Sequence, residues 1–245
     1  MNLLKTTLLA TATIAALASC RKADDTEGAV CFSLDQQAVV ADVVTRSYVS
    51  DYTTLPSASD FTITVKSGSS TVYSGLLSGY DSSTKLNAGN YTVDAVYGAE
   101  GEEGFDKPYF TGSTAFAVQG GATTSVSIPV SLANSIIKVA VTSAFENYFK
   151  DWSFTVSTGS SNTISFPKGE TRAAFVDAYR FTVSGTMTSQ SGAASSFSKE
   201  YTSGIEAATC YTLRFDVSNV GGLTVTVTFN DTVETVDLGT VELND

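Results

Sequence analysis

Apolar and polar residues alternate along most of the chain, as they do in half-buried β-strands. In the run from Phe61 to Val65, threonines separate the three apolar residues. Alternation with Thr and Ser gives each strand one buried and one solvated face, which is typical of antiparallel sheets packed in pairs. The pattern therefore predicts an all-β fold. Similar runs occur at residues 91–97, 126–132, 137–141, 152–156, 179–183, 211–217 and 223–229.

The pattern is laid out twice. Residues 60–65 (DFTITV) match residues 151–156 (DWSFTV), and residues 122–134 (ATTSVSIPVSLAN) match residues 207–219 (AATCYTLRFDVSN). The period is on the order of 90 residues, a normal size for one β-sandwich. We therefore expect two tandem antiparallel β-sandwich domains, at residues 29–133 and 134–245.

One short helical segment interrupts the strands. Ser143-Ala144-Phe145-Glu146 fits a capping box, in which the Ser and Glu side chains satisfy backbone amides at a helix start. Phe145, Tyr148 and Phe149 then share one face of the helix. We expect this helix to close one end of the second sandwich.

The N-terminus predicts export and lipid attachment. Residues 1–19 combine a basic Lys5 with an apolar stretch too short to span a bilayer, so they form a signal peptide. Leu17-Ala18-Ser19-Cys20 resembles a bacterial lipobox, which makes Cys20 the lipidation site. Residues 20–28 are mostly polar and form a tether. Two or more acyl chains on Cys20 hold a protein firmly at a membrane.

Charge and composition exclude several functions. The formal net charge is −11, so the surface repels phosphate backbones and we expect no nucleic-acid partner. Histidine is absent, which removes Ser-His-Asp and Cys-His catalysis and His-ligated zinc. We expect no enzymatic activity, no metal and no cofactor. Cys31 and Cys210 lie in strand-like runs of different domains, and we favour two buried thiols over a disulfide.

The segment at residues 98–109 (GAEGEEGFDKPY) is unusually acidic. Glu100, Glu102, Glu103 and Asp106 could supply oxygen ligands to a cation such as calcium, although their spacing does not fit an EF-hand. The alternative is a mobile acidic surface loop without a ligand, which we favour.

Aromatic residues raise the alternative of glycan binding. Tyr80, Tyr109, Phe110 and Trp152 could form a stacking platform for sugars. Most aromatic residues in the chain occupy the alternating core positions, so we favour burial for these four.

Arg46 and Ser47 mark a candidate processing site. Arg46 follows a strand-like segment at residues 29–44 and precedes a polar stretch. An exposed site of this kind would be open to an Arg-specific protease. A loop arginine without any role is the alternative.

Four further segments form motifs: residues 104–113 (GFDKPYFTGS), 116–118 (FAV), 131–134 (SLAN) and 145–156 (FENYFKDWSFTV). They resemble motifs of a Bacteroidales surface lipoprotein family of unknown function. That family shows an FDxPYYxGSxxFTV motif, a CKLAN motif and an aromatic FxxxFxDYxVTV stretch. Val130 stands where the family commonly has Cys, and Trp152 where it has Tyr. The resemblance covers nearly the whole mature chain, and none of its motifs is catalytic.

The layout is also similar to that of fimbrillin-type pilus subunits. Those proteins have a lipobox, two transthyretin-like β-sandwich domains and an Arg cleavage site after the first strand. The resemblance implies that a cut between Arg46 and Ser47 removes the lipid and the preceding strands. A strand from a neighbouring subunit, from Thr232 to Leu243, would then fill the opened groove.

The sequence thus predicts a lipid-anchored protein exposed at the outer membrane, with a structural or adhesive role like that of fimbrillins. Its expected partners are the membrane, through the lipid, and other pilus subunits or host ligands. The alternative is a surface glycan-binding lipoprotein of a polysaccharide-capture system.

Overall fold

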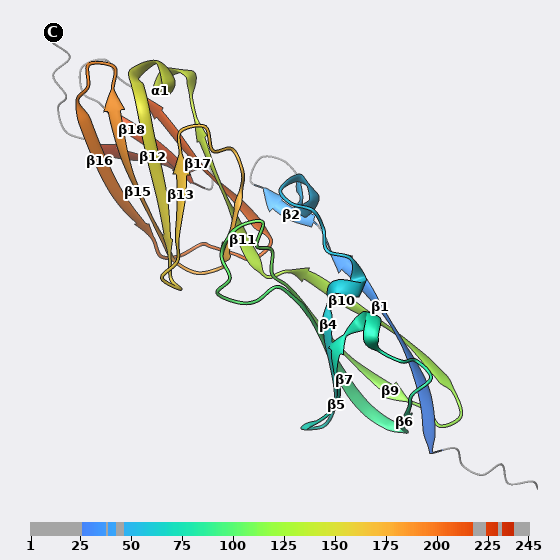
Figure 1. Cartoon of the computed structure of the whole chain (residues 1–245). Helices are drawn as coiled ribbons and strands as arrows, with labels where there is room; N and C mark the ends of the chain where they lie inside the picture. Colours follow the sequence, from blue (N-terminus) through green and yellow to red (C-terminus); the bar gives the residue numbers. More distant parts are fainter. Residues whose placement is uncertain (1–25, 38, 43–46, 218–223, 230–231, 238–245) are drawn as a thin grey trace, which may run out of the picture.

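The computed structural model describes residues 26–37, 39–42, 47–217, 224–229 and 232–237. These residues form two β-sandwich domains placed end to end, with one short α-helix and three 3-10 turns (Figure 1). The predicted all-β architecture is therefore confirmed. No helix in this part of the chain is long and apolar enough to cross a membrane.

The first domain is one seven-stranded sheet that folds over on itself. The sheet order is β5-β4-β7-β9-β10-β1-β6, and β9 pairs with β10 at only two positions. The sheet therefore divides there into two facing layers, which enclose one core. Its strands are β1 (Glu27–Gln37), β4 (Thr62–Ser67), β5 (Ser70–Leu76), β6 (Lys85–Asn87), β7 (Gly89–Tyr97), β9 (Phe110–Val118) and β10 (Thr123–Leu132).

The second domain packs two separate sheets against each other. One has the order β13-β12-β15-β16 and the other the order β19-β18-β17-β11-β14-β8. Their strands are β11 (Asn134–Val141), β12 (Phe149–Thr158), β13 (Thr163–Pro167), β14 (Ala174–Asp177), β15 (Phe181–Ser189), β16 (Ala194–Tyr201), β17 (Thr209–Val217), β18 (Thr224–Phe229) and β19 (Thr232–Asp237).

Three short strands from the N-terminal half also join the second domain's sheet. β2 (Val39–Asp42) pairs with β17 and with β3 (Ser47–Tyr48), and β8 (Gly104–Phe105) pairs with β14. The sheets of the two sequence halves are thus connected by more than the link from β10 to β11.

The two domains share one topology, as the repeated pattern predicts. β4 pairs with β5 and β7 in the first domain, as β12 pairs with β13 and β15 in the second. β1 lies parallel to β10 and antiparallel to β6, as β11 lies parallel to β17 and antiparallel to β14. β1 and β11 are therefore equivalent strands. Alternation alone does not distinguish these parallel pairs from antiparallel ones.

The alternating apolar residues form the two cores. Ile63, Val93 and Ile128 are fully buried in the first domain, and Phe154 and Phe215 in the second. The rings of Phe154 and Phe215 stack with centroids 3.8 Å apart, which joins the two sheets of the second domain.

The short helix α1 (Ser143–Tyr148) closes one end of the second sandwich (Figure 1). Its Phe145 is fully buried and lies 5.4 Å from the Trp152 ring. The predicted cap is wrong by one residue, because Thr142 and not Ser143 precedes the first helical turn. The Thr142 hydroxyl accepts a hydrogen bond of 3.2 Å from Phe145 N and donates one of 2.6 Å to Asp216.

The expectation that both strand cysteines are buried is wrong for one of them. Cys210 is buried, but Cys31 is exposed on the outer side of β1, and neither is in a disulfide in the described structure. The neighbouring Val30 is fully buried, so the inward face of β1 carries Val30 and not Cys31.

The cap assignment gives the first testable prediction. Thr142→Ala should destabilise the second domain by about 1 kcal/mol, because it removes the cap of α1. Ser143→Ala is the matched control and should change stability by less than about 0.5 kcal/mol. Trp152 is the only tryptophan in the chain, so its fluorescence during urea unfolding follows this domain selectively. A larger effect for Ser143→Ala would contradict the assignment.

Candidate functional site

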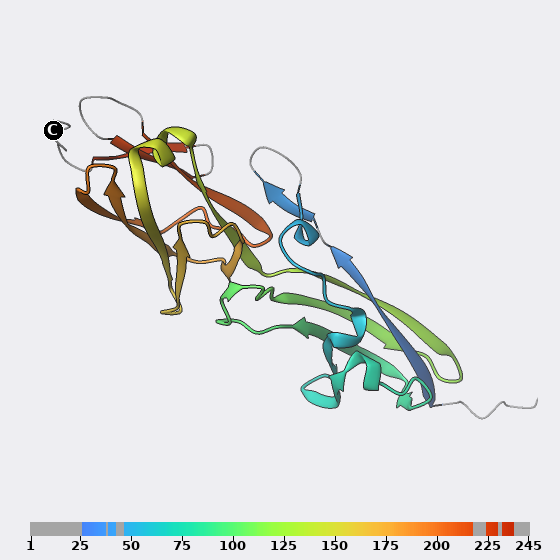
Figure 2. The ribbon, with the colours of Figure 1, turned by 45° about the horizontal axis from the view of Figure 1, so that its top comes forward.

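The acidic segment 98–109 crosses from the first domain to the second. It connects β7 to β9 and contains β8, whose residues Gly104 and Phe105 pair with Phe175 and Ala174 of β14. Figure 2 shows this connection reaching from the first sandwich toward the second. We call residues 98–108 the interdomain clasp. It is not the mobile surface loop that we favoured from the sequence, because it adds a strand to the neighbouring domain.

Glu103 is the centre of the clasp. Its carboxylate accepts hydrogen bonds from the Thr158 hydroxyl, from Asn162 Nδ2 at 2.8 Å and from the Asp177 backbone N at 2.8 Å. Asn162 Nδ2 also donates to the carbonyl oxygen of Gly101 at 2.9 Å. All three donors to the Glu103 carboxylate belong to the second domain. Hydrogen bonds to an ionised acceptor are stronger than neutral ones, so this side chain holds the domains together.

Apolar and cationic contacts extend the clasp. The Phe105 ring meets Phe166 edge to face at 5.2 Å, and the Arg172 guanidinium lies 4.3 Å from the Phe105 ring centroid. Arg172 is itself held by Glu170 through bonds of 2.8 and 3.1 Å. The hydrogen bonds from Arg172 lower the pKa of Glu170 to about 2. Arg172 therefore stays oriented over Phe105 at neutral pH.

The other acidic residues of the clasp are exposed. Glu102 lies 3.8 Å from Lys107, and Asp106 accepts a hydrogen bond of 3.3 Å from the Thr53 hydroxyl. Among the described residues, no group of three or more acidic or cysteine side chains is placed to hold a metal ion. The four predicted oxygen ligands are thus separated, with Glu103 turned toward the second domain and Glu100 toward a cavity.

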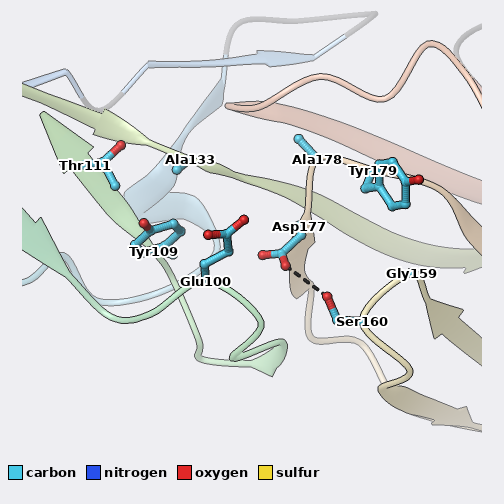
Figure 3. A pocket seen from close by; sticks show the side chains of 9 residues that line it. All are labelled: Glu100, Tyr109, Thr111, Ala133, Gly159, Ser160, Asp177, Ala178 and Tyr179. Atoms are coloured by element: carbon cyan, nitrogen blue, oxygen red, sulfur yellow. Dashed lines mark hydrogen bonds between the residues drawn. The ribbon is translucent and has the colours of Figure 1, made fainter.

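That cavity lies between the two domains and has a volume of about 530 Å³ (Figure 3). Asp177, at the end of β14, presents its carboxylate there. It accepts hydrogen bonds of 3.1 Å from the Ser160 hydroxyl and from Gly101 N. Burial and the nearby Glu103 carboxylate raise the pKa of Asp177. We call this space the interdomain cavity; it is lined by Glu100, Tyr109, Thr111, Ala133, Gly159, Ser160, Asp177, Ala178 and Tyr179.

A second candidate site is the position of β1 in the first domain. β1 pairs with β10 in parallel over nine positions, from Ala29 to Gln37. Val30 is fully buried, and the Phe32 ring lies 4.8 Å from Tyr80 and 5.5 Å from Phe116. β6 covers the outer edge of β1 only at residues 27–29. The rest of that edge has no strand beside it in the described structure.

Gly28 fits tightly at the start of β1. A Cβ atom there would lie 2.2 Å from the carbonyl oxygen of Gln119 and 2.9 Å from that of Ala122, both in the β9–β10 turn. Backbone atoms cannot move aside cheaply. Any strand in this place and register therefore needs a glycine at this point.

Two predicted site residues, Cys20 and Arg46, lie outside the described residues. Ser47 is described, in β3, and is only 9% exposed. Its hydroxyl accepts a hydrogen bond of 2.9 Å from the Tyr52 hydroxyl. The next residue, Tyr48, is 51% exposed.

Three of the four candidate sugar-stacking aromatics belong to the cores. Phe110 is fully buried and Trp152 is 6% exposed, with Lys168 Nζ 4.7 Å from the centroid of its ring. Tyr80 packs against Phe32 and against Tyr73, with centroids 5.0 Å apart in the second pair. Burial is therefore confirmed for Phe110 and Trp152. Of these four aromatic residues, Tyr109 is the one that lines the interdomain cavity.

Sequence reasoning did not identify the cavity residues that come from the second domain. Ser160, Asp177 and Tyr179 lie in a turn and at a strand end of the second domain, with no motif around them. The alternating run at residues 179–183 placed Tyr179 on the buried face of a strand. This prediction is wrong, because β15 begins at Phe181 and Tyr179 is 61% exposed.

Comparisons with known proteins identify a family. A family model described as "Domain of unknown function (DUF4493)" matches residues 26–243. No curated protein matches the chain significantly.

Several solved structures share a similar chain trace. A candidate cell adhesion protein from Bacteroides uniformis is 13% identical with a TM-score of 0.44, over 75% of this chain and 94% of that one. A candidate polysaccharide-binding protein from Bacteroides thetaiotaomicron is 11% identical with a TM-score of 0.43, over 86% and 98%. The fimbrial anchor protein Mfa2 from Porphyromonas gingivalis is 10% identical with a TM-score of 0.40, over 88% and 100%.

The clasp gives the second testable prediction. Glu103→Gln should weaken clasp docking by about 1–3 kcal/mol. The new side-chain amide has one acceptor oxygen in place of two, so its NH2 group must face at least one of the three hydrogen-bond donors. The measurement is hydrogen exchange of the Asp177 backbone amide and of peptides covering the clasp. Glu102→Gln is the control: it removes only an exposed ion pair and should leave exchange nearly unchanged. Equal exchange in both variants would contradict the role of Glu103.

Proposed function

The chain belongs to this DUF4493 family, and we propose that it is a lipid-anchored cell-surface subunit with a structural or adhesive role. In this proposal Cys20 carries the lipid and places the protein at the outer membrane. The first strand is replaceable, and its loss allows one subunit to accept a strand from the next. The observation that carries the proposal is that β1 pairs with β10 alone over most of its length.

β1 has the properties of a strand that another chain could replace. It is the first strand of its domain, so a single cut after it frees it from the fold. Its main-chain bonds run to β10 alone over most of its length, and its inward residues cover an apolar surface. Loss of β1 would leave β10 with an unpaired edge and would expose Tyr80 and Phe116. An edge of this kind pairs readily with another strand.

Cleavage between Arg46 and Ser47 would release β1 together with β2. β2 pairs with β17 at two positions, so little main-chain pairing holds it to the second domain. The lipidated Cys20 would leave on the same fragment. Ser47 is nearly buried, so we expect the cut to require local opening of β3.

The expected donor strand from Thr232 to Leu243 overlaps β19, which pairs with β18 of its own chain, so we restrict the donor to the residues that follow β19 in a second copy. The place of β1 requires Gly at position 28 and then inward residues at positions 30 and 32. Gly239-Thr240-Val241-Glu242-Leu243 offers glycine and two apolar residues at the same spacing as Gly28-Ala29-Val30-Cys31-Phe32. We propose this register for the incoming strand, with Glu242 in the exposed position of Cys31.

A similar spacing at residues 221–225 (GGLTV) is a weaker candidate. Residues 224 and 225 belong to β18, which is already paired with both β17 and β19. Its use would require breaking two ladders of the second domain.

Processing of the purified full-length protein tests the proposal. An arginine-specific protease should cut after Arg46 and produce a ladder of oligomers on a native gel and in size-exclusion chromatography. Arg46→Gln should prevent both the cut and the oligomers. Arg180→Gln, which alters an arginine of the second domain, should prevent neither. Processed wild-type protein that stays monomeric would refute the polymerising subunit.

The register has its own pair of variants. Gly239→Val should leave cleavage intact but reduce oligomers at least about tenfold, because a side chain meets the β9–β10 turn. Glu242→Val places the same side chain at the exposed position and should assemble normally. If both variants assemble equally, the register is wrong even where strand exchange occurs.

A further inference from the structure

The interdomain cavity has no part in the proposed strand exchange. All of its lining residues lie between Glu100 and Tyr179, so none of them belongs to the N-terminal strands or the C-terminal segment. Its volume of about 530 Å³ falls within the range of small-molecule sites, roughly 300–1,000 Å³. Residues of both domains form its walls (Figure 3).

Two carboxylates face the cavity, and hydrogen bonds hold one of them in place. The Asp177 carboxylate is held by Ser160 Oγ and Gly101 N, each at 3.1 Å. The Glu100 carboxylate lies on the facing side of the cavity (Figure 3), carried there by the clasp. Among the described residues, no Lys or Arg side chain lines the space, and Arg180 lies 5.7 Å from the Tyr179 ring centroid. Two carboxylates in the lining repel phosphates, sulfates and carboxylates, so an anionic ligand does not fit.

Aromatic rings bound the cavity from both domains. Tyr109 lies on the side of the first domain and Tyr179 on the side of the second (Figure 3). The Tyr179 ring packs against Gly159, where a Cβ atom would lie 2.4 Å from the ring, yet the residue is 61% exposed. An exposed ring held in one place can stack against a ligand without a large loss of side-chain entropy.

We infer that the interdomain cavity binds a neutral saccharide. Sugar hydroxyl groups donate hydrogen bonds to the Asp177 and Glu100 carboxylates, and the apolar face of a sugar ring stacks on Tyr179. The Thr111 hydroxyl can donate or accept at the edge of the ligand, and the Ser160 hydroxyl, which donates to Asp177, can accept. A small cation would use the carboxylates alone and leave the aromatic and alanine walls unused. A polyhydroxyl ring uses both kinds of surface.

Isothermal titration calorimetry of the full chain with neutral trisaccharides tests the inference. The probes are maltotriose, cellotriose, mannotriose and triacetylchitotriose, in 150 mM NaCl, with trigalacturonic acid as the anionic counterpart. At least one neutral probe should bind, and trigalacturonic acid should not. Binding should change less than about twofold between 150 and 500 mM salt, because no ion pair forms.

Variants locate the binding. Tyr179→Ala should weaken it at least about fivefold through lost stacking, and Asp177→Asn should weaken it about tenfold through a lost charged acceptor. Tyr48→Ala is the matched control, since Tyr48 is 51% exposed but does not line the cavity. Its affinity should stay within twofold of the wild type.

Four outcomes would overturn the inference. They are no binding by any neutral probe, preference for trigalacturonic acid, equal affinity of the wild type and Tyr179→Ala, and binding of free arginine or spermidine in place of sugars with strong salt dependence. The Arg46→Gln protein should bind like the wild type, so failure here and failure of strand exchange are separate results.

Discussion

Glu103 belongs to the first domain by its backbone and to the second by its hydrogen bonds. Its carboxylate satisfies the Asp177 amide and the side chains of Thr158 and Asn162. These bonds offset the desolvation of a half-buried charge, which would be costly without partners. They also place β8 against β14 and hold Glu100 and Asp177 on facing sides of the cavity. The junction of the two domains combines these bonds with a buried apolar cluster, in which Ile136, Phe175 and Cys210 of the second domain pack with core residues of the first.

The strand pairings that the two domains share make one difference between them informative. β11 is joined to β10 through Ala133 alone and leads directly into α1, so it is covalently fixed at both ends. β1 occupies the equivalent place, but among the described residues no strand or helix precedes it. In the proposed exchange, a single backbone cut would release β1 and could not release β11. The same parallel pairing would then be kept in the second domain and replaced in the first.

Alternation in the sequence predicted the duplication and the strands β4, β7, β10, β11, β12, β15, β17 and β18, because burial of one face depends on local order. It gave no run for β5, β9, β13, β14 or β16, and the helix followed instead from its cap and its aromatic spacing. It was insufficient for β8, since two residues, Gly104 and Phe105, carry no period. It also missed β3, and it placed β2 in one strand-like segment with β1, although β2 pairs with β17 of the other domain. The interdomain cavity depends on residues up to about 80 positions apart, brought together by β8 and β14. Of these residues only Glu100 and Tyr109 were singled out in advance, and each for a different reason.

The clasp allows both proposals to hold for the same molecule. The segment that would leave, with β1 and β2, contacts both domains, yet residues 98–108 stay behind. After processing, Glu103 and Phe105 would still join the domains, and every lining residue of the cavity would remain. A polymer of processed subunits would then present one cavity per subunit along its length. Repeated weak sites raise avidity by effective concentration, so modest affinity at each cavity is sufficient for adhesion.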